Sequence, residues 1–333
     1  MKSKTINTLF VLITIASIIL SACGNASTPA AVGAAEGEKL SGSAELSGTI
    51  TISGAFALYP MMTLWTEEFQ KVYPDVKFDL SAGGAGKGMT DAIAGAVDIG
   101  MVSRGIKPEE EAQGAYWVAV TKDAVFPTLN PKNPVINDII AQGITQDIFI
   151  KIYITGEITT WGQVVGKPEI TDEIHVYTRS DACGAAEMWA KFLGDKLQED
   201  LLGIAVNADP GLLDAVIKDP LGIGFNNLGY AYDLASGNVV NGAAVAPIDL
   251  NADGKADDDE RLETMPEAID AVASGKYPSP PARALNLVTL NKPTGLVQTF
   301  ILWILNEGQG FVGQGGYVQL TPEQLAESLA KVK

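Results

Sequence analysis

Cysteine and histidine, on which most thiol and metal chemistry depends, are scarce in this sequence. Its 333 residues include one histidine, His175, and two cysteines, Cys23 and Cys183. One histidine and two cysteines are fewer than the four ligands of a closed zinc site, which argues against a zinc enzyme. A secreted hydrolase with Cys183 as its nucleophile is disfavoured too, because His175 lies about 13 Å from the end of its predicted strand, beyond hydrogen-bond reach of the thiol. We therefore expect no catalytic role.

Basic residues and long apolar runs are also lacking. Lys and Arg total 23 against 40 Asp and Glu, which gives a formal net charge of −17. Such an acidic chain repels nucleic acid, so we expect no nucleic-acid partner. Small anions are not excluded, because they respond to local donors rather than to total charge. Two apolar runs, residues 9–20 and 296–305, are shorter than the roughly 20 residues of a membrane-spanning helix.

The N-terminus contains the parts of a bacterial lipoprotein signal in the expected order. Two lysines precede the apolar run, and Leu20-Ser21-Ala22-Cys23 follows it. We expect residues 1–22 to be removed and Cys23 to be lipidated, which would anchor the protein to the cell membrane outside the cytoplasm. A lipidated Cys23 would also leave Cys183 without a disulfide partner. The alternative is an ordinary secretory signal with an incidental cysteine.

Small polar residues at 23–46 predict a flexible tether between the lipidated cysteine and a folded part. Strand and helix patterns then alternate, which is typical of an α/β fold with parallel strands. The predicted strands are 48–53, 75–80, 98–103, 174–179 and 283–290, and residues 220–232 are predicted as a strand and turn. The predicted helices are 61–73, 89–97, 184–193 and 296–305.

Three loops of small residues each follow a predicted strand and precede a predicted helix. They are residues 53–56, 84–87 and 181–185. Free backbone N–H groups and the helix dipole make such positions favourable for anions. Small side chains let the backbone approach the ligand closely. Arg179, at the end of its strand, could add a bidentate guanidinium.

Five segments also occur in the order and spacing of a known family. They are SGAFALYPMMTLWTEEF, SAGGAGKGMTDAIAGAVDIGMVSR, RSDACGAAEMWAKFLG, LGIGFNNLGY and NLVTLNKPTGLVQTFILWILNEGQGFVGQGGYVQL. Over residues 48–320 the chain resembles the phosphate-binding lipoproteins of phosphate ABC importers. The resemblance implies a type II periplasmic-binding-protein fold, with a ligand cleft between two α/β domains. Domain I would comprise residues 47–117 and 284–333, and domain II residues 118–283, with a hinge at the crossover strands.

The resemblance also implies a set of ligand-binding residues. Arg179 would be a direct ligand and Asp181 would orient it. The full expected set is Gly54, Ala55, Phe56, Ala85, Gly86, Lys87, Ser103, Arg104, Arg179, Asp181, Cys183, Gly184 and Ala185. Relatives commonly place Ser or Thr where this chain has Phe56, Ala85, Cys183 and Ala185, and some carry an aspartate at the position of Arg104.

We therefore expect an extracytoplasmic lipoprotein, located in the periplasm or on the cell surface, that captures phosphate as a monomer. It would deliver the phosphate to the permease subunits of an ABC importer and would need no catalytic cofactor. The altered loop residues leave two alternatives open. The ligand could be another oxyanion, such as sulfate, molybdate or arsenate, or the protein could act in sensing. With ligand bound, Cys183 would be a neutral thiol and a weak donor that replaces a hydroxyl.

An acidic loop, DLNADGKADDDE at residues 249–260, matches the calcium-loop pattern D-x-N-x-D-G-x5-E. Gly254 would permit the sharp turn of such a loop. The expected ligands are Asp249, Asn251, Asp253, the backbone carbonyl of Lys255, Asp257 and Glu260. The residues before the loop are not helical, so we expect an isolated structural Ca²⁺ site rather than a paired EF-hand. A solvated acidic loop is the alternative.

Overall fold

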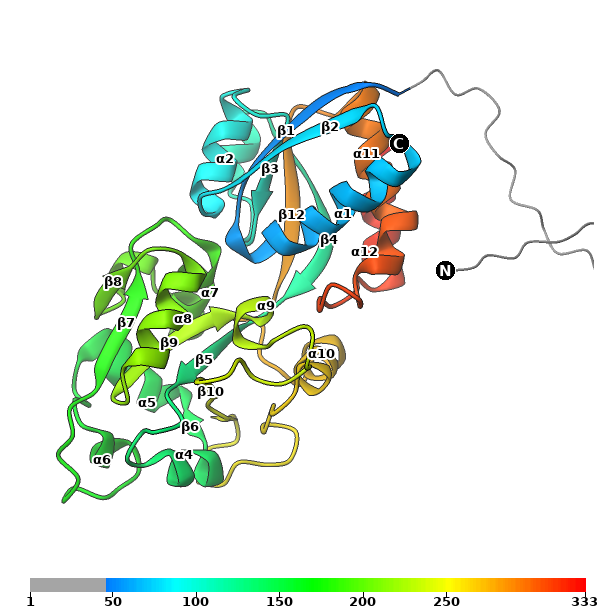
Figure 1. The fold of residues 1–333 in the computed structure, drawn as a ribbon. Helices are drawn as coiled ribbons and strands as arrows, with labels where there is room; N and C mark the ends of the chain where they lie inside the picture. Colours follow the sequence, from blue (N-terminus) through cyan, green and yellow to red (C-terminus); the bar gives the residue numbers. More distant parts are fainter. Residues whose placement is uncertain (1–45) are drawn as a thin grey trace, which may run out of the picture. The chain divides into compact units, whose positions relative to one another are not determined.

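The computed structural model describes residues 46–333 (Figure 1). The predicted signal, Cys23 and nearly all of the tether lie outside these residues. Each of the two five-stranded sheets of the described chain is mixed in strand direction. The α/β fold with two lobes that the sequence indicated is confirmed.

The first sheet has the strand order β2-β1-β3-β12-β4. Its strands are β1 (Gly48–Gly54), β2 (Val76–Ala82), β3 (Ile99–Val102), β4 (Ala115–Asp123) and β12 (Arg283–Leu290). Strands β1, β2 and β3 are parallel, as the alternating strands and helices predicted. Strand β12 runs antiparallel to both β3 and β4, because the chain returns to this sheet from the second lobe.

The second sheet has the order β10-β5-β9-β7-β8. Its strands are β5 (Val125–Leu129), β7 (His175–Arg179), β8 (Ile204–Val206), β9 (Gly222–Asn227) and β10 (Ala244–Val245). Strand β7 is parallel to β8 and β9, while β5 is antiparallel to β9 and β10. A small parallel pair joins β6 (Ile144–Thr145) to β11 (Ile248–Asp249).

Helices cover both sheets. In the first lobe, α2 lies on one side of the sheet, and α1, α11 and α12 lie on the other (Figure 1). The helices of this lobe are α1 (Tyr59–Val72), α2 (Ala85–Ile93), α3 (Pro108–Ala112), α11 (Gly295–Leu305) and α12 (Pro322–Val332). Those of the second lobe are α4 (Ile136–Gln142), α5 (Gln146–Ile150), α6 (Trp161–Val164), α7 (Gly184–Phe192), α8 (Ala208–Lys218), α9 (Leu228–Ala231) and α10 (Met265–Ser274).

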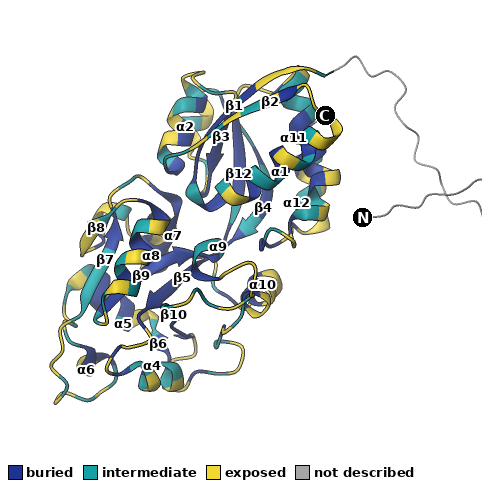
Figure 2. Cartoon of the chain, in the orientation of Figure 1, coloured by how far each residue is buried: buried dark blue, intermediate teal, exposed yellow. Residues whose placement is uncertain are grey.

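Each sheet is the centre of its own hydrophobic core. One core gathers around Trp65, Phe69 and Phe300, and the other around Trp189 and Phe225. Buried residues follow the strands, and exposed residues lie on the outer faces of the helices (Figure 2). Because each lobe has its own hydrophobic core, the two lobes can pack independently and leave room for a ligand site between them. We call residues 46–123 and 283–333 the first lobe and residues 124–282 the second lobe.

The predicted elements agree with the structure except at some boundaries and at residues 228–231, which were predicted within a strand and turn and form helix α9. The predicted domain limits at 117/118 and 283/284 stay predictions, although the first sheet itself includes residues up to Asp123 and begins again at Arg283. The helix predicted from Met89 starts four residues earlier, at Ala85. Gly84 lies just before the helix with a φ of 90°, a conformation that glycine adopts readily. This conformation allows the helix to start at Ala85.

Candidate functional site

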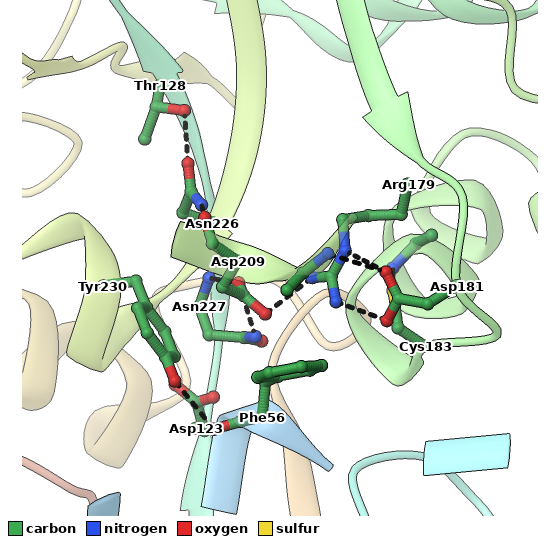
Figure 3. Close-up of polar contacts among 12 residues, drawn as sticks. Phe56, Asp123, Thr128, Arg179, Asp181, Cys183, Asp209, Asn226, Asn227 and Tyr230 are labelled. Atoms are coloured by element: carbon green, nitrogen blue, oxygen red, sulfur yellow. Dashed lines mark hydrogen bonds and ion pairs between the residues drawn. The ribbon is translucent and has the colours of Figure 1, made fainter. Parts of the chain in front are cut away.

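Arg179, the last residue of β7, is the centre of the candidate site (Figure 3). Its side chain is fully buried. Its Nε and Nη2 donate to the two carboxylate oxygens of Asp181 at 2.8 and 2.6 Å, and its Nη1 donates to Asp209 at 2.6 Å. Burial disfavours the charged guanidinium, but the negative charges beside it, with Asp209 first, outweigh this effect and raise the pKa of Arg179 above its ordinary value.

Asp209 is a site residue that the sequence analysis missed. It lies in the first turn of α8 and is 1% exposed. Its Oδ1 accepts hydrogen bonds from the backbone N–H of Asn227 at 3.2 Å and from the side-chain amide of Asn227 at 2.8 Å. One sequence signal could have identified Asp209: it is an acidic residue within Asn-Ala-Asp-Pro-Gly, which follows a short strand and begins a helix.

The first predicted loop approaches Arg179 through Phe56. The guanidinium carbon of Arg179 lies 5.6 Å from the centre of the Phe56 ring, within the range of a cation–π contact. Tyr230 of the second lobe donates a hydrogen bond to the backbone oxygen of Phe56 at 3.3 Å. Gly54 must be glycine here, because its φ is 133° and an added Cβ would lie 2.3 Å from the backbone oxygen of Met101.

The second predicted loop is the first turn of α2, since that helix begins at Ala85. The N–H of Gly86 donates to the backbone oxygen of Ala182 at 3.0 Å, so it bonds to the opposite lobe. The ammonium of Lys87 forms an ion pair with Asp91 one turn along the same helix. Both groups therefore have partners other than Arg179, and their part in an anion site stays a prediction.

The third predicted loop leads into α7, whose N-cap residue is Cys183. The Sγ of Cys183 accepts from the N–H of Ala186 at 3.4 Å, and its role as a donor to a bound ligand stays a prediction. Burial raises the pKa of Cys183 to about 12, against the opposing effect of Arg179, so the thiol is neutral at physiological pH. Gly184 packs against Ser103, where an added Cβ would lie 2.3 Å from the Ser103 backbone oxygen.

Arg104 does not join Arg179. It donates to both carboxylate oxygens of Glu110 at 2.9 and 2.6 Å, and its Nε lies 3.1 Å from a carboxylate oxygen of Glu187. Glu110 belongs to the first lobe and Glu187 to α7 of the second, so Arg104 links the lobes. A cavity of 240 Å³ beside it is lined by Gly86, Arg104, Ala182, Cys183 and Glu187 among others.

A buried polar chain connects the site to the crossover strands. Asn227, which holds Asp209, also accepts a hydrogen bond from Arg283 at the start of β12. Arg283 donates to the backbone oxygen of Ser103 at 3.1 Å and lies 3.3 Å from Asp123 at the end of β4. The network therefore joins Arg179 to both strands that pass between the lobes.

Two other predicted features lie outside this network. His175 pairs with Asp219 at 2.6 Å, at the end of β7 opposite Arg179. In the acidic loop, the side chains accept hydrogen bonds from the loop's own backbone, such as Gly254 N–H to Asp249 at 3.0 Å. Within residues 46–333, no group of three or more His, Cys, Asp or Glu side chains is arranged to hold a metal ion.

Comparison with curated proteins identifies relatives along most of the chain. The phosphate-binding protein PstS of Bacillus subtilis strain 168 is 29% identical over 308 residues, which cover 91% of this chain and 90% of that protein. A phosphate-binding protein PstS of Methanocaldococcus jannaschii is 25% identical over 329 residues, covering 81% of this chain and 84% of that protein. The resemblance that the sequence motifs indicated is confirmed.

Solved structures share the fold. An ABC-type phosphate transport receptor from Vibrio cholerae has a TM-score of 0.60 at 20% identity, covering 81% of this chain and 100% of that one. A phosphate-bound protein of Clostridium perfringens, assigned as the substrate-binding component of a phosphate ABC transporter, has a TM-score of 0.66 at 23% identity, covering 82% and 100%. A family model described as a PBP superfamily domain matches residues 40–307. The chain therefore belongs to the PBP superfamily.

Proposed function

We propose that this protein captures inorganic phosphate outside the cytoplasm and delivers it to an ABC importer. The observation that carries the proposal is the buried guanidinium of Arg179, which lies where the turn before α7, the start of α8 and Phe56 meet. A guanidinium with spare N–H donors beside a helix N-terminus is suited to a tetrahedral oxyanion. The relatives named for phosphate binding support phosphate as that oxyanion. The protein binds and releases its ligand and is not an enzyme.

Calorimetric titration of the full-length protein with phosphate tests this proposal. We expect saturable binding of one phosphate at micromolar concentration or below, and a loss of about a hundredfold or more in Arg179→Ala. Arg261→Ala is the matched control, because Arg261 makes only an exposed pair with Asp258 and should bind phosphate as the wild type does. Absence of phosphate binding by a folded wild-type protein would refute the proposed ligand.

The same titration distinguishes the second candidate, another oxyanion. It is favoured by the apolar or thiol side chains of Phe56, Ala85, Cys183 and Ala185, which offer no hydroxyl to a ligand. Sulfate, molybdate and arsenate are therefore titrated in parallel with phosphate. Tighter binding of molybdate than of phosphate, for example, would move the assignment to that anion while leaving transport in place.

We further propose that Cys23 carries the lipid that holds the protein at the membrane, with residues 1–22 removed. The support is the order of the signal's parts in the sequence. Separately, none of the helices in residues 46–333 has the length and apolar character needed to cross a membrane. Intact-mass spectrometry of the protein extracted from membranes should show the loss of residues 1–22 and added acyl chains. An unmodified Cys23 would contradict the anchor.

We also propose a structural Ca²⁺ site in the acidic loop. Its support is the complete loop pattern together with Asp249, which is 2% exposed and whose Oδ1 is buried without a hydrogen-bond partner. Gly254, at the sixth position, has the positive φ of 80° that such a loop requires. Ca²⁺ would supply the missing partner of Asp249 and tie the loop to β11 and its neighbour β6.

Differential scanning calorimetry with calcium and with chelator tests this site. Ligand that binds only the folded state raises the melting temperature, by about 2–4 °C for a protein of this size if calcium contributes about 1 kcal/mol. Asp249→Asn should abolish the shift, and Asp214→Asn, on the exposed face of α8, should preserve it. Equal melting temperatures with calcium and with chelator would refute the proposal.

A further inference from the structure

We propose that a cavity between the lobes, beside the crossover strands, is a second ligand site for a small carboxylate that carries an aromatic ring and one hydrogen-bond donor. Its volume of 380 Å³ falls within the range of sites that hold small organic molecules. We call it the hinge cavity, and its lining includes Arg104, Ile106, Trp117, Met188, Lys191 and Asn286. Neither Arg179 nor its partners Asp181 and Asp209 line it, so it is separate from the proposed phosphate site.

The charged side chains that line the hinge cavity are all cationic. They are Arg104, Lys191 and Arg283, and across residues 46–333 no Asp or Glu belongs to the lining. The chain as a whole has 40 acidic and only 23 basic residues, so its average composition does not account for such a lining. A ligand that enters the hinge cavity therefore meets N–H donors rather than carboxylates, which favours an anionic group on the ligand.

Lys191 is the cation with the most capacity for a ligand. Its side chain is 42% exposed, and its ion-pair partner Glu187, one turn earlier on α7, lies 3.6 Å away, beyond ordinary hydrogen-bond distance. Glu187 is itself held by Nε of Arg104 at 3.1 Å. The two arginines are already paired, Arg104 with Glu110 and Glu187 and Arg283 with Asp123. A carboxylate on a ligand can thus take the ammonium of Lys191 without breaking a buried ion pair.

Asn286 supplies an acceptor for the donor on the ligand. It is 3% exposed, and its Nδ2 donates to the backbone oxygen of Arg104 at 3.0 Å. That bond to a carbonyl oxygen fixes which end of the amide is the donor. The other end, Oδ1, is buried and has no hydrogen-bond partner within the described chain. A buried acceptor without a partner costs free energy, so an N–H or O–H of a ligand would stabilise it.

Apolar side chains complete the hinge cavity. Ile106 and Trp117 contribute to its wall from the first lobe, and Met188, which is 5% exposed, contributes from α7 of the second lobe. An aromatic ring placed among these side chains leaves water and gains contacts with the indole and the thioether sulfur. The three features together specify the chemical class: a carboxylate for Lys191, a donor for Asn286 and a ring for the apolar wall.

Residues of both lobes line the hinge cavity, and this gives its ligand a mechanical effect. A molecule that contacts Trp117 of the first lobe and Lys191 of the second binds most tightly when the lobes touch. Its binding therefore stabilises the arrangement of touching lobes. Because phosphate is proposed to bind between the same lobes, we expect the two ligands to strengthen each other's binding. Only this coupling rests on the proposed function.

Calorimetric titration of the full-length protein with indole-3-acetate tests the site, because this molecule carries the carboxylate, the ring and the N–H donor. We expect a dissociation constant of about 0.1–1 mM. Indole-3-acetamide lacks the charge and 1-naphthaleneacetate lacks the N–H, and each should bind about fivefold more weakly. Absence of binding by indole-3-acetate, or equal binding of all three compounds, would overturn the proposal.

Lys191→Met removes the ammonium and keeps an unbranched side chain. We expect it to weaken the binding of indole-3-acetate about fivefold and to leave that of indole-3-acetamide unchanged. Lys218→Met is the matched control, because Lys218 makes an exposed ion pair with Asp214 on α8 and does not line the hinge cavity. Indole-3-acetate that binds Lys191→Met as tightly as the wild type would overturn the assignment.

A phosphate titration with and without saturating indole-3-acetate tests the coupling. We expect phosphate to bind about fivefold more tightly when indole-3-acetate is present. Weaker phosphate binding would show that indole-3-acetate competes at Arg179 and would overturn the second site, and unchanged phosphate binding would overturn the coupling. Failure of phosphate to bind in both conditions would refute the proposed function alone, because the binding of indole-3-acetate is measured without phosphate.

Discussion

Asp123 is a fully buried carboxylate at the end of β4, where the chain leaves the first lobe. Its Oδ1 accepts from the backbone N–H groups of Ala124 and Leu228 at 2.7 and 3.1 Å, and its Oδ2 faces Arg283. Burial raises the pKa of Asp123 to about 6, although Arg283 acts in the opposite direction. At this position the desolvation of the carboxylate outweighs its ion pair.

The raised pKa of Asp123 makes the free energy of unfolding depend on pH. The pKa of Asp123 is higher in the folded protein than the ordinary 3.8. Folding therefore favours its protonated form, and the free energy of unfolding falls as the pH rises from about 4 through about 6. A pKa that folding raises from 3.8 to about 6 corresponds to a loss of about 3 kcal/mol across this range.

Urea unfolding of the wild type and Asp123→Asn across this pH range measures the effect. The wild type should lose about 2–3 kcal/mol relative to the variant between about pH 4 and pH 7, even if the variant is less stable throughout because Arg283 loses its partner. Asp214→Asn should follow the wild-type profile. Parallel profiles for wild type and Asp123→Asn would show that this carboxylate ionises normally.

The sequence indicated part of the site residue by residue. Arg179 and Asp181 are two positions apart at the end of a strand, and their pairing depends only on that local geometry. Asp209 is 30 positions after Arg179, and nothing local in the sequence brings the two together. Their contact depends on how α8 packs against β7 and β9, which no short motif encodes.

At the scale of elements, the two lobes are joined by direct bonds across the cleft. Arg104, just after β3, reaches Glu187 of α7, and the N-terminal turn of α2 bonds to the turn before α7. These contacts stabilise the arrangement in which the lobes touch. The sequence predicted α2 and α7 as helices, and the family resemblance placed Arg104 among the ligand-binding residues. The glutamate partners of Arg104 lie on other elements, so its ion pairs could not be predicted from the sequence.

The contact between Arg104 and Glu187 gives a prediction for lobe opening. Glu187→Gln removes the ion pair across the cleft and leaves the pair of Arg104 with Glu110 within the first lobe. We expect the unliganded protein to populate a more open form, and phosphate affinity to fall about two- to tenfold as the competent state becomes rarer.

Small-angle X-ray scattering of the unliganded protein, together with calorimetry, measures both effects. Glu110→Gln is the matched control, because it alters the same arginine without touching the second lobe. An unchanged radius of gyration and unchanged affinity in Glu187→Gln would show that this ion pair does not hold the lobes together.

For the whole molecule, the alternation of strands and helices predicted an α/β fold, and the family resemblance carried by five segments implied its two lobes. Strand β12 was predicted at its observed residues, 283–290, but its antiparallel direction was not. Direction depends on where the chain returns from the second lobe, and this is a property of the topology rather than of the strand's own residues. The position of Arg179 at the end of a strand was thus predictable, while the charges around it depend on the assembled lobe.

The central claim is that phosphate binds at Arg179, and a crystal structure of the full-length protein grown with phosphate at about pH 5.5 tests it most directly. We expect tetrahedral density within hydrogen-bond distance of the two N–H groups that Asp181 and Asp209 leave on Arg179. Phosphate bound elsewhere, or an Arg179 contacted only by its two aspartates and Phe56 at saturating phosphate, would contradict the account.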